Sequence, residues 1–67
     1  MAVWYIQQDE TGEYGYELKE GKLFYIERDK ESNSSNTEEV AIQEFLKHYK
    51  QETQDPYPQI IKALESL

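Results

Sequence analysis

The sequence has no cysteine, three glycines, two prolines and a single histidine. Without cysteine the chain can form neither a disulfide nor a thiolate zinc site, and cysteine-based catalysis is excluded. A domain without disulfides is typical of the cytosol, so we expect a cytoplasmic protein. The glycines lie in or beside expected turns, and none opens a helix as a phosphate-binding loop requires. We therefore expect no nucleotide and no other cofactor.

Long hydrophobic runs are also missing. The longest apolar run covers residues 2–6, far shorter than the roughly 20 residues that span a bilayer. No basic segment precedes an apolar stretch as in a signal peptide. We expect a soluble intracellular protein, complete from Met1, with no membrane partner.

Positive charge is scarce: 7 lysines and arginines face 14 acids, giving a net charge of −7. The acids are spread along the chain, and no segment forms the basic patch that phosphate binding requires, so we expect no direct nucleic-acid binding. Two interpretations of this charge stay open. It can serve solubility alone, or it can form an anionic face that meets a protein partner with a basic surface.

The first half of the sequence predicts strands. Residues 3–6 are aromatic and β-branched, the segment 9–12 favours a type I turn, and Glu20-Gly21 supplies the positive φ of a second turn. The result is a three-stranded antiparallel meander with strands near residues 3–6, 14–19 and 23–28. A two-residue second turn places Tyr16 opposite Tyr25 on one face and sends Phe24 to the other.

Polar residues follow, and then two helical patterns. We expect a flexible connector at about 29–36 and a helix that begins within a window set by the S-x-x-E capping box of residues 35–38, with Thr37 before two glutamates as an equally good start. Asp55 is the expected N-cap of a second helix. The apolar positions repeat at helical spacing: Ile42, Phe45, Leu46 and Tyr49, then Tyr57, Ile60, Ile61, Leu64 and Leu67. The predicted fold is one small acidic α+β domain over 1–67, with both helices packed on one face of the sheet (βββαα).

Catalytic groups are few. His48 stands alone with no neighbouring ligand set, so we assign it neither a metal nor a base role. The serines of the connector have no base beside them, and adjacent carboxylates such as Glu38 and Glu39 are typical of a helix N-terminus. We predict that the protein is not an enzyme and binds no metal.

The aromatic residues offer the best candidate binding surface, because two helices cover only one face of a sheet that carries large side chains on both. Tyrosine is enriched at protein interfaces, and acidic neighbours argue for a protein partner rather than for stacked bases. The predicted partner-binding residues are Tyr14, Tyr16, Tyr25 and Phe24, with an acidic rim of Glu13, Glu17 and Glu27. The alternative, that these tyrosines only fill the core, stays open.

The stretch IQQDETGEYGYELKEG, followed by NTEEVAIQEFLKHY, is similar to the HicB-like antitoxins. In that family an opening strand, a D/E-G turn, a second strand and a later T-x-E-E-A helix run in the same order. The similarity covers residues 3–49. The family's Pro-Asp-Leu-Pro-Gly segment is absent, and nothing after Tyr49 looks like its DNA-binding tail. The resemblance implies a small acidic protein that neutralises another protein.

We therefore expect a non-enzymatic, acidic protein–protein interaction module that acts as a small inhibitor or regulator of a protein target. Antitoxins and phage or mobile-element inhibitors are examples of the type, and one version of the hypothesis is nucleic-acid mimicry. The alternative is a structural or assembly protein that forms a homodimer through the sheet, using its exposed face or a strand edge.

Overall fold

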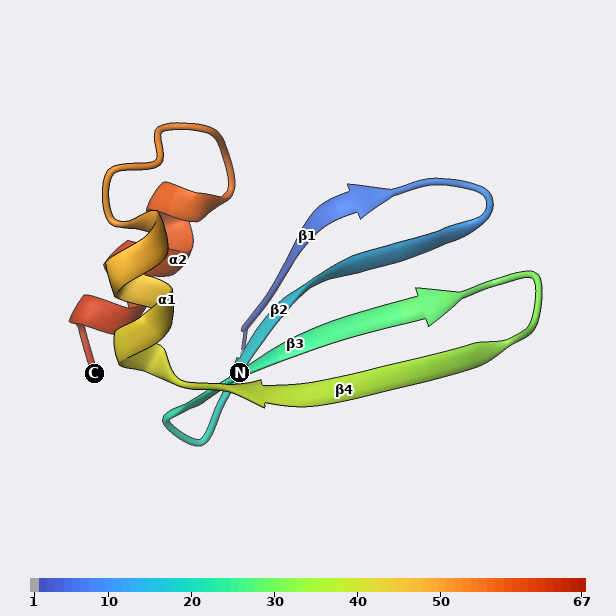
Figure 1. Ribbon diagram of the computed structural model, residues 1–67, viewed down its shortest axis with the longest axis horizontal. Coiled ribbons are helices and arrows are strands. Elements are labelled where there is room, and N and C mark those ends of the chain that lie inside the picture. Colours follow the sequence, from blue (N-terminus) through green and yellow to red (C-terminus); the bar gives the residue numbers. More distant parts are fainter. Residues whose placement is uncertain (1) are drawn as a thin grey trace.

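A computed structural model describes residues 2–67, and its architecture is a four-stranded sheet followed by two helices (Figure 1). The strands are β1 (Ala2–Gln8), β2 (Gly12–Lys19), β3 (Lys22–Asp29) and β4 (Ser34–Val40), and the helices are α1 (Ile42–Tyr49) and α2 (Tyr57–Glu65). The sheet is antiparallel throughout, in the spatial order β1-β2-β3-β4. The α+β class is confirmed, but the sheet has four strands where the sequence predicted three.

The turn between β2 and β3 forms as predicted. Glu20 and Gly21 have φ values of 54° and 76°, the two positive values of a type I′ hairpin turn, whose twist matches that of the flanking strands. This turn sets the register, so Tyr16 pairs with Tyr25 and Leu18 with Leu23.

The segment after β3 is where the prediction fails. The chain reverses through residues 30–33, where Asp29 Oδ1 accepts the amide hydrogen of Glu31 at 3.0 Å and Asn33 takes a φ of 55°. It then pairs with β3 as β4, so the expected flexible connector at 29–36 is wrong in its second half. The capping box is also wrong, because Ser35 and Glu38 lie in β4 and α1 begins only at Ile42.

Both helices bury apolar residues that the sequence predicted, but each begins at a different residue from the predicted one. Phe45 is buried on α1, and Ile60, Ile61 and Leu64 are buried on α2. Asp55 was expected to cap α2, but Pro56 takes that position and its carbonyl accepts the Ile60 amide hydrogen at 3.1 Å. Leu67 lies beyond α2 and is 66% exposed.

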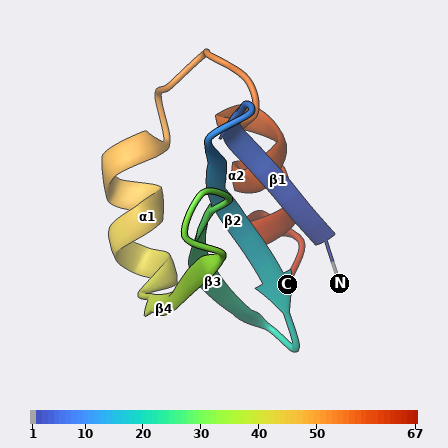
Figure 2. The same cartoon turned by 90° about the vertical axis from the view of Figure 1, so that its right-hand side faces the viewer.

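The core lies between the helices and one end of the sheet. Its buried residues are Leu23, Phe45, Ile60, Ile61 and Leu64, and Trp4, Tyr16, Leu18 and Val40 pack against them from the strands. These strand residues cluster near the β2–β3 turn. Figure 1 shows both helices at that end, while the β1–β2 and β3–β4 loops project at the other; Figure 2 looks at the molecule from the loop end. Half of one face and all of the other are therefore left without helices.

A β-bulge shapes strand β1. Tyr5 pairs with Gly15 and Gln7 with Tyr14, which leaves Ile6 as the extra residue. Gly15 is buried at this point, and a Cβ on it would collide with the Trp4 carbonyl oxygen. Only glycine allows β1 to approach β2 so closely, and the bulge bends the outer strand.

Candidate protein-interaction surfaces

The seven predicted contact residues divide between the two faces of the sheet, because side chains alternate along each strand. The helix side, on which α1 and α2 pack, carries Tyr14, Tyr16, Tyr25 and Glu27, and the opposite side carries Glu13, Glu17 and Phe24. They form two surfaces rather than one.

On the helix side, aromatic rings form a continuous row from the core to the uncovered half of the sheet. Tyr16 lies edge-on to Phe45 at a centroid distance of 4.9 Å and to Tyr25 at 5.7 Å. Tyr25 in turn lies 6.3 Å from Tyr14, which is 36% exposed. Burial raises the pKa of the Tyr16 hydroxyl. Tyr16 is thus a packing residue at the edge of the core, whereas Tyr14 presents its ring to solvent.

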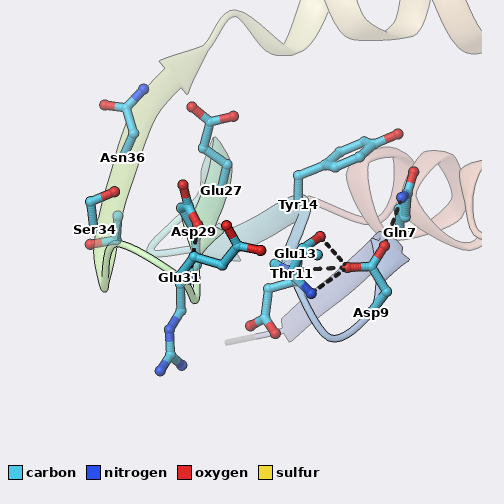
Figure 3. A pocket seen from close by; sticks show the side chains of 13 residues that line it. Gln7, Asp9, Thr11, Glu13, Tyr14, Glu27, Asp29, Glu31, Ser34 and Asn36 are labelled. Atoms are coloured by element: carbon cyan, nitrogen blue, oxygen red, sulfur yellow. Dashed lines mark hydrogen bonds between the residues drawn. The ribbon is translucent and has the colours of Figure 1, made fainter.

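The outer end of this row is acidic. Tyr14 pairs across β3 and β4 with Glu27 and Asn36, and Tyr25 pairs with Glu38. These five residues, Tyr14, Tyr25, Glu27, Asn36 and Glu38, are called the acidic shelf. Figure 3 shows Tyr14, Glu27 and Asn36 extending to the same side of the strands.

Hydrogen bonding holds part of the shelf in place. The Tyr25 hydroxyl donates to Glu27 Oε2 at 3.2 Å. Burial raises the pKa of Tyr25, and the hydrogen bond to Glu27 and the charge of that carboxylate raise it further. Neither of the two ion pairs formed within residues 2–67 includes Glu27 or Glu38. The shelf therefore carries two carboxylates without a neutralising base.

Beyond the shelf, a hollow of about 530 Å³ that is open to solvent lies between the two loops. The β1–β2 loop is built around Asp9, whose Oδ1 accepts hydrogen bonds from the Thr11 hydroxyl at 2.7 Å and from the amides of Thr11 and Gly12 at 2.9 and 3.1 Å (Figure 3). The Thr11 hydroxyl bond first, then a bond from Gln7 Nε2 to Asp9 Oδ2 at 3.2 Å and the two amide bonds, lower the pKa of Asp9 to about 2. Lys30 joins the loops, because its Nζ donates to the Asp9 carbonyl at 3.1 Å and lies 3.6 Å from Glu13 Oε1.

The hollow is acidic but holds no metal-binding cluster. Its lining includes Asp9, Glu13, Glu27, Asp29 and Glu31. Across the part of the chain that the structure describes, no three acidic or histidine side chains converge as metal ligands would. His48 lies on the exposed side of α1, 3.6 Å from Glu44.

The face opposite the helices is called the open face. Its cross-strand rows read Val3, Glu17, Phe24 and Glu39, then Tyr5, Gly15, Ile26 and Thr37, then Gln8, Glu13, Arg28 and Ser35, with Lys19 and Lys22 at the turn. Val3 is 42% exposed and Tyr5 40%. Burial raises the pKa of Tyr5, and the negative charge of Glu13 raises it further. Apolar side chains thus stand between charges on an uncovered sheet.

Two shelf residues were not predicted. Glu38 and Asn36 were assigned to a helix start and a connector, and only the pairing of β4 with β3 brings them beside Tyr25 and Glu27. The alternation of Ser35, Thr37 and Glu39 with Asn36, Glu38 and Val40 is the one signal of a strand, and it lacks the apolar face that normally marks one.

Comparisons with protein-family models, curated proteins and solved structures give no match. The similarity to the HicB-like antitoxins therefore gains no support. Within residues 2–67, neither helix is long and apolar enough to cross a membrane.

Proposed function

We propose that this protein is a non-enzymatic interaction module that binds a basic segment of a protein target on its acidic shelf and so inhibits or regulates that target. The observation that supports this is an exposed tyrosine ring, Tyr14, opposite the carboxylate of Glu27, with Glu38 opposite Tyr25 in the next cross-strand row; neither carboxylate forms an ion pair within residues 2–67. The net charge of −7 acts in the same direction, because it attracts basic surfaces over distances of about a Debye length.

An arginine side chain fits this chemistry best. Its guanidinium can lie flat against an aromatic ring, which is worth about 0.5–1 kcal/mol at an exposed site. Its fork of N–H groups can also donate two parallel hydrogen bonds to one carboxylate. Tyr14 supplies the ring, and Glu27 supplies a carboxylate already oriented by the Tyr25 hydroxyl. Lysine would gain the charge attraction but not the paired geometry.

The regulatory effect would be occlusion. A module of 67 residues that covers a basic surface prevents whatever normally binds there from reaching it. If that surface binds nucleic acid, the carboxylates take the place of phosphates and the complex weakens steeply as salt rises. Affinity that is insensitive to salt would exclude nucleic-acid mimicry and leave steric occlusion.

A peptide titration tests the shelf directly. We would add the peptide acetyl-Gly-Arg-Gly-Arg-Gly-amide to the protein at low salt and follow backbone amide chemical shifts by NMR. The expected dissociation constant is on the order of 1 mM, with the largest shifts at Tyr14, Tyr25, Glu27 and Glu38. The lysine version of the peptide should bind more weakly and with a more diffuse pattern.

Matched variants separate the shelf from net charge. Glu27→Gln and Glu65→Gln each remove one negative charge, but Glu65 lies on α2 outside the shelf. We expect Glu27→Gln to weaken peptide binding about 3–10-fold, as the loss of about 1 kcal/mol implies, and Glu65→Gln to change it less than about 2-fold. Equal effects of the two variants would show that only the total charge attracts the peptide, and the proposal would fail.

A further inference from the structure

The open face differs from the rest of the molecule in charge. Its charged residues are three acids, Glu13, Glu17 and Glu39, and three bases, Lys19, Lys22 and Arg28. The face is therefore neutral, and the net charge of −7 resides entirely on the remainder of the chain. A second copy of this chain, which is repelled elsewhere, meets no net repulsion here.

The open face is also apolar enough to bury. Val3 and Tyr5 are 42% and 40% exposed on β1, and Phe24 and Ile26 are half-buried on β3. A hollow of about 220 Å³ lies between Tyr5, Ile26 and Thr37, with room for a side chain from a partner. Exposed apolar groups gathered between charges are typical of contact surfaces rather than of free ones.

The size of the face suits a modest interface. Four strands about 4.8 Å apart and seven residues long give a footprint of about 19 by 23 Å. Two such faces have a projected area of about 870 Å², which is the size of a weak, transient interface below the roughly 1,200 Å² of standard complexes.

We propose that the open face is the interface of a homodimer, in which the sheets of two copies stack face to face. Such an interface is isologous, so each contact occurs twice. A two-fold axis that runs across the strands places each strand over its own copy in the reverse direction, with Lys19 near Glu13 of the second copy and Lys22 near Arg28 of the second copy. An axis along the strands places β2 over β3 of the second copy, with Glu13 near Arg28 and Lys19 near Lys22. Each arrangement brings together one set of opposite charges and one set of like charges, so the two differ in the partner of Arg28 rather than in overall charge.

Pairing through strand edges is the less favourable route to a dimer. The outer edge of β1 is interrupted by the bulge at Ile6, and bulges hinder edge-to-edge pairing. The outer edge of β4 carries polar and acidic side chains, which would meet like charges in a second copy.

Two neighbouring residues of β4 give a matched test. Thr37 and Asn36 are both exposed, but Thr37 lies on the open face and Asn36 on the acidic shelf. The mass of each variant would be measured by sedimentation equilibrium over a range of concentrations, with thermal unfolding as a check of folding. We expect a weak wild-type dimer with a dissociation constant on the order of 100 micromolar. Thr37→Arg should weaken it at least 10-fold, and Asn36→Arg should leave it unchanged.

Reversing the charge of Arg28 tests the orientation of the dimer. When the axis runs across the strands, Arg28→Glu places a carboxylate near Lys22 of the second copy, so the dimer should become tighter. When the axis runs along the strands, it places a carboxylate near Glu13 of the second copy, so the dimer should become weaker. A wild-type protein that is monomeric up to about 1 mM would overturn the proposal, as would a dimer unaffected by Thr37→Arg. A dimer whose dissociation constant is unaffected by Arg28→Glu would overturn the face-to-face stacking.

Failure of this proposal is distinguishable from failure of the proposed function. Asn36→Arg places a positive charge on the shelf, so it should abolish binding of the arginine peptide while the dimer persists. Thr37→Arg should weaken the dimer and leave binding of the arginine peptide unchanged. The dimer and the peptide binding can each fail without the other, because the two surfaces lie on opposite faces of the sheet.

Discussion

Replacing Tyr16 by alanine tests whether the tyrosines of β2 are packing or binding residues. Tyr16 contacts Phe45 and Tyr25 at centroid distances of 4.9 and 5.7 Å. Each such aromatic pair is worth about 0.5–1.5 kcal/mol beyond area burial, and truncating a buried aromatic residue costs about 3–5 kcal/mol in total. Since Tyr16 is half-buried, we expect a loss near 3 kcal/mol. That is a large part of the roughly 3–10 kcal/mol that a domain of this length has.

The assay is thermal and urea unfolding followed by circular dichroism. A loss of 3 kcal/mol lowers the Tm of a domain this small by about 12–24 °C. Tyr16→Phe keeps both ring contacts and should stay within about 1 kcal/mol of wild type. Tyr14→Ala, which removes an exposed ring, should also cost only about 1 kcal/mol. If Tyr16→Ala proves as stable as Tyr14→Ala, the row of rings does not stabilise the core and the assignment of Tyr16 is refuted.

Two further predictions concern the strands and loops. Gly15→Ala should destabilise the protein by about 3 kcal/mol, because its Cβ would collide with the Trp4 carbonyl oxygen. Gly21→Ala has free space and only a positive φ of 76°, so it should cost about 1–2 kcal/mol. Urea unfolding that ranks the two variants in the reverse order would contradict this. The pKa of Asp9 is lowered from 3.8 to about 2, so its hydrogen bonds stabilise the folded state fully above about pH 4 and this contribution is lost as the pH falls towards 2. Asp9→Ala should therefore flatten the dependence of stability on pH in this range, and a variant whose acid unfolding profile is parallel to that of wild type would show that the Asp9 loop is not formed.

The sequence predicted correctly those elements whose own residues form the turn or pack in the core. The Glu20-Gly21 turn fixed the register of β2 and β3, since a two-residue loop permits only one pairing. The apolar spacing of Ile42, Phe45 and Tyr49 identified the face of α1 because those residues must meet the core.

Strand β4 could not be predicted from its own residues. Of its seven residues only Val40 packs against the core, and the rest are exposed. Its stability comes from backbone pairing with β3, which is a property of the neighbouring strand rather than of the local sequence. The same polar residues suit a helix N-terminus equally well. Glu38 was therefore assigned to a helix cap, and the predicted binding surface did not include it. Tertiary context decided between two locally acceptable structures.

Because the helices cover only one end of the sheet, the strands should open locally more often at their loop ends than near the β2–β3 turn. Near the β2–β3 turn the strands are held by the core around Leu23, whereas their loop ends are held by backbone hydrogen bonds and a few exposed side-chain contacts. Amide hydrogens near Leu23 should exchange with solvent only through global unfolding, and those near Glu27 and Asn36 through smaller fluctuations. A ligand on the acidic shelf would hold the most loosely held part of the sheet, so part of its binding free energy would go into ordering those strand ends. Slower amide exchange at the loop ends, with the turn end unchanged, would then accompany occupancy of the shelf.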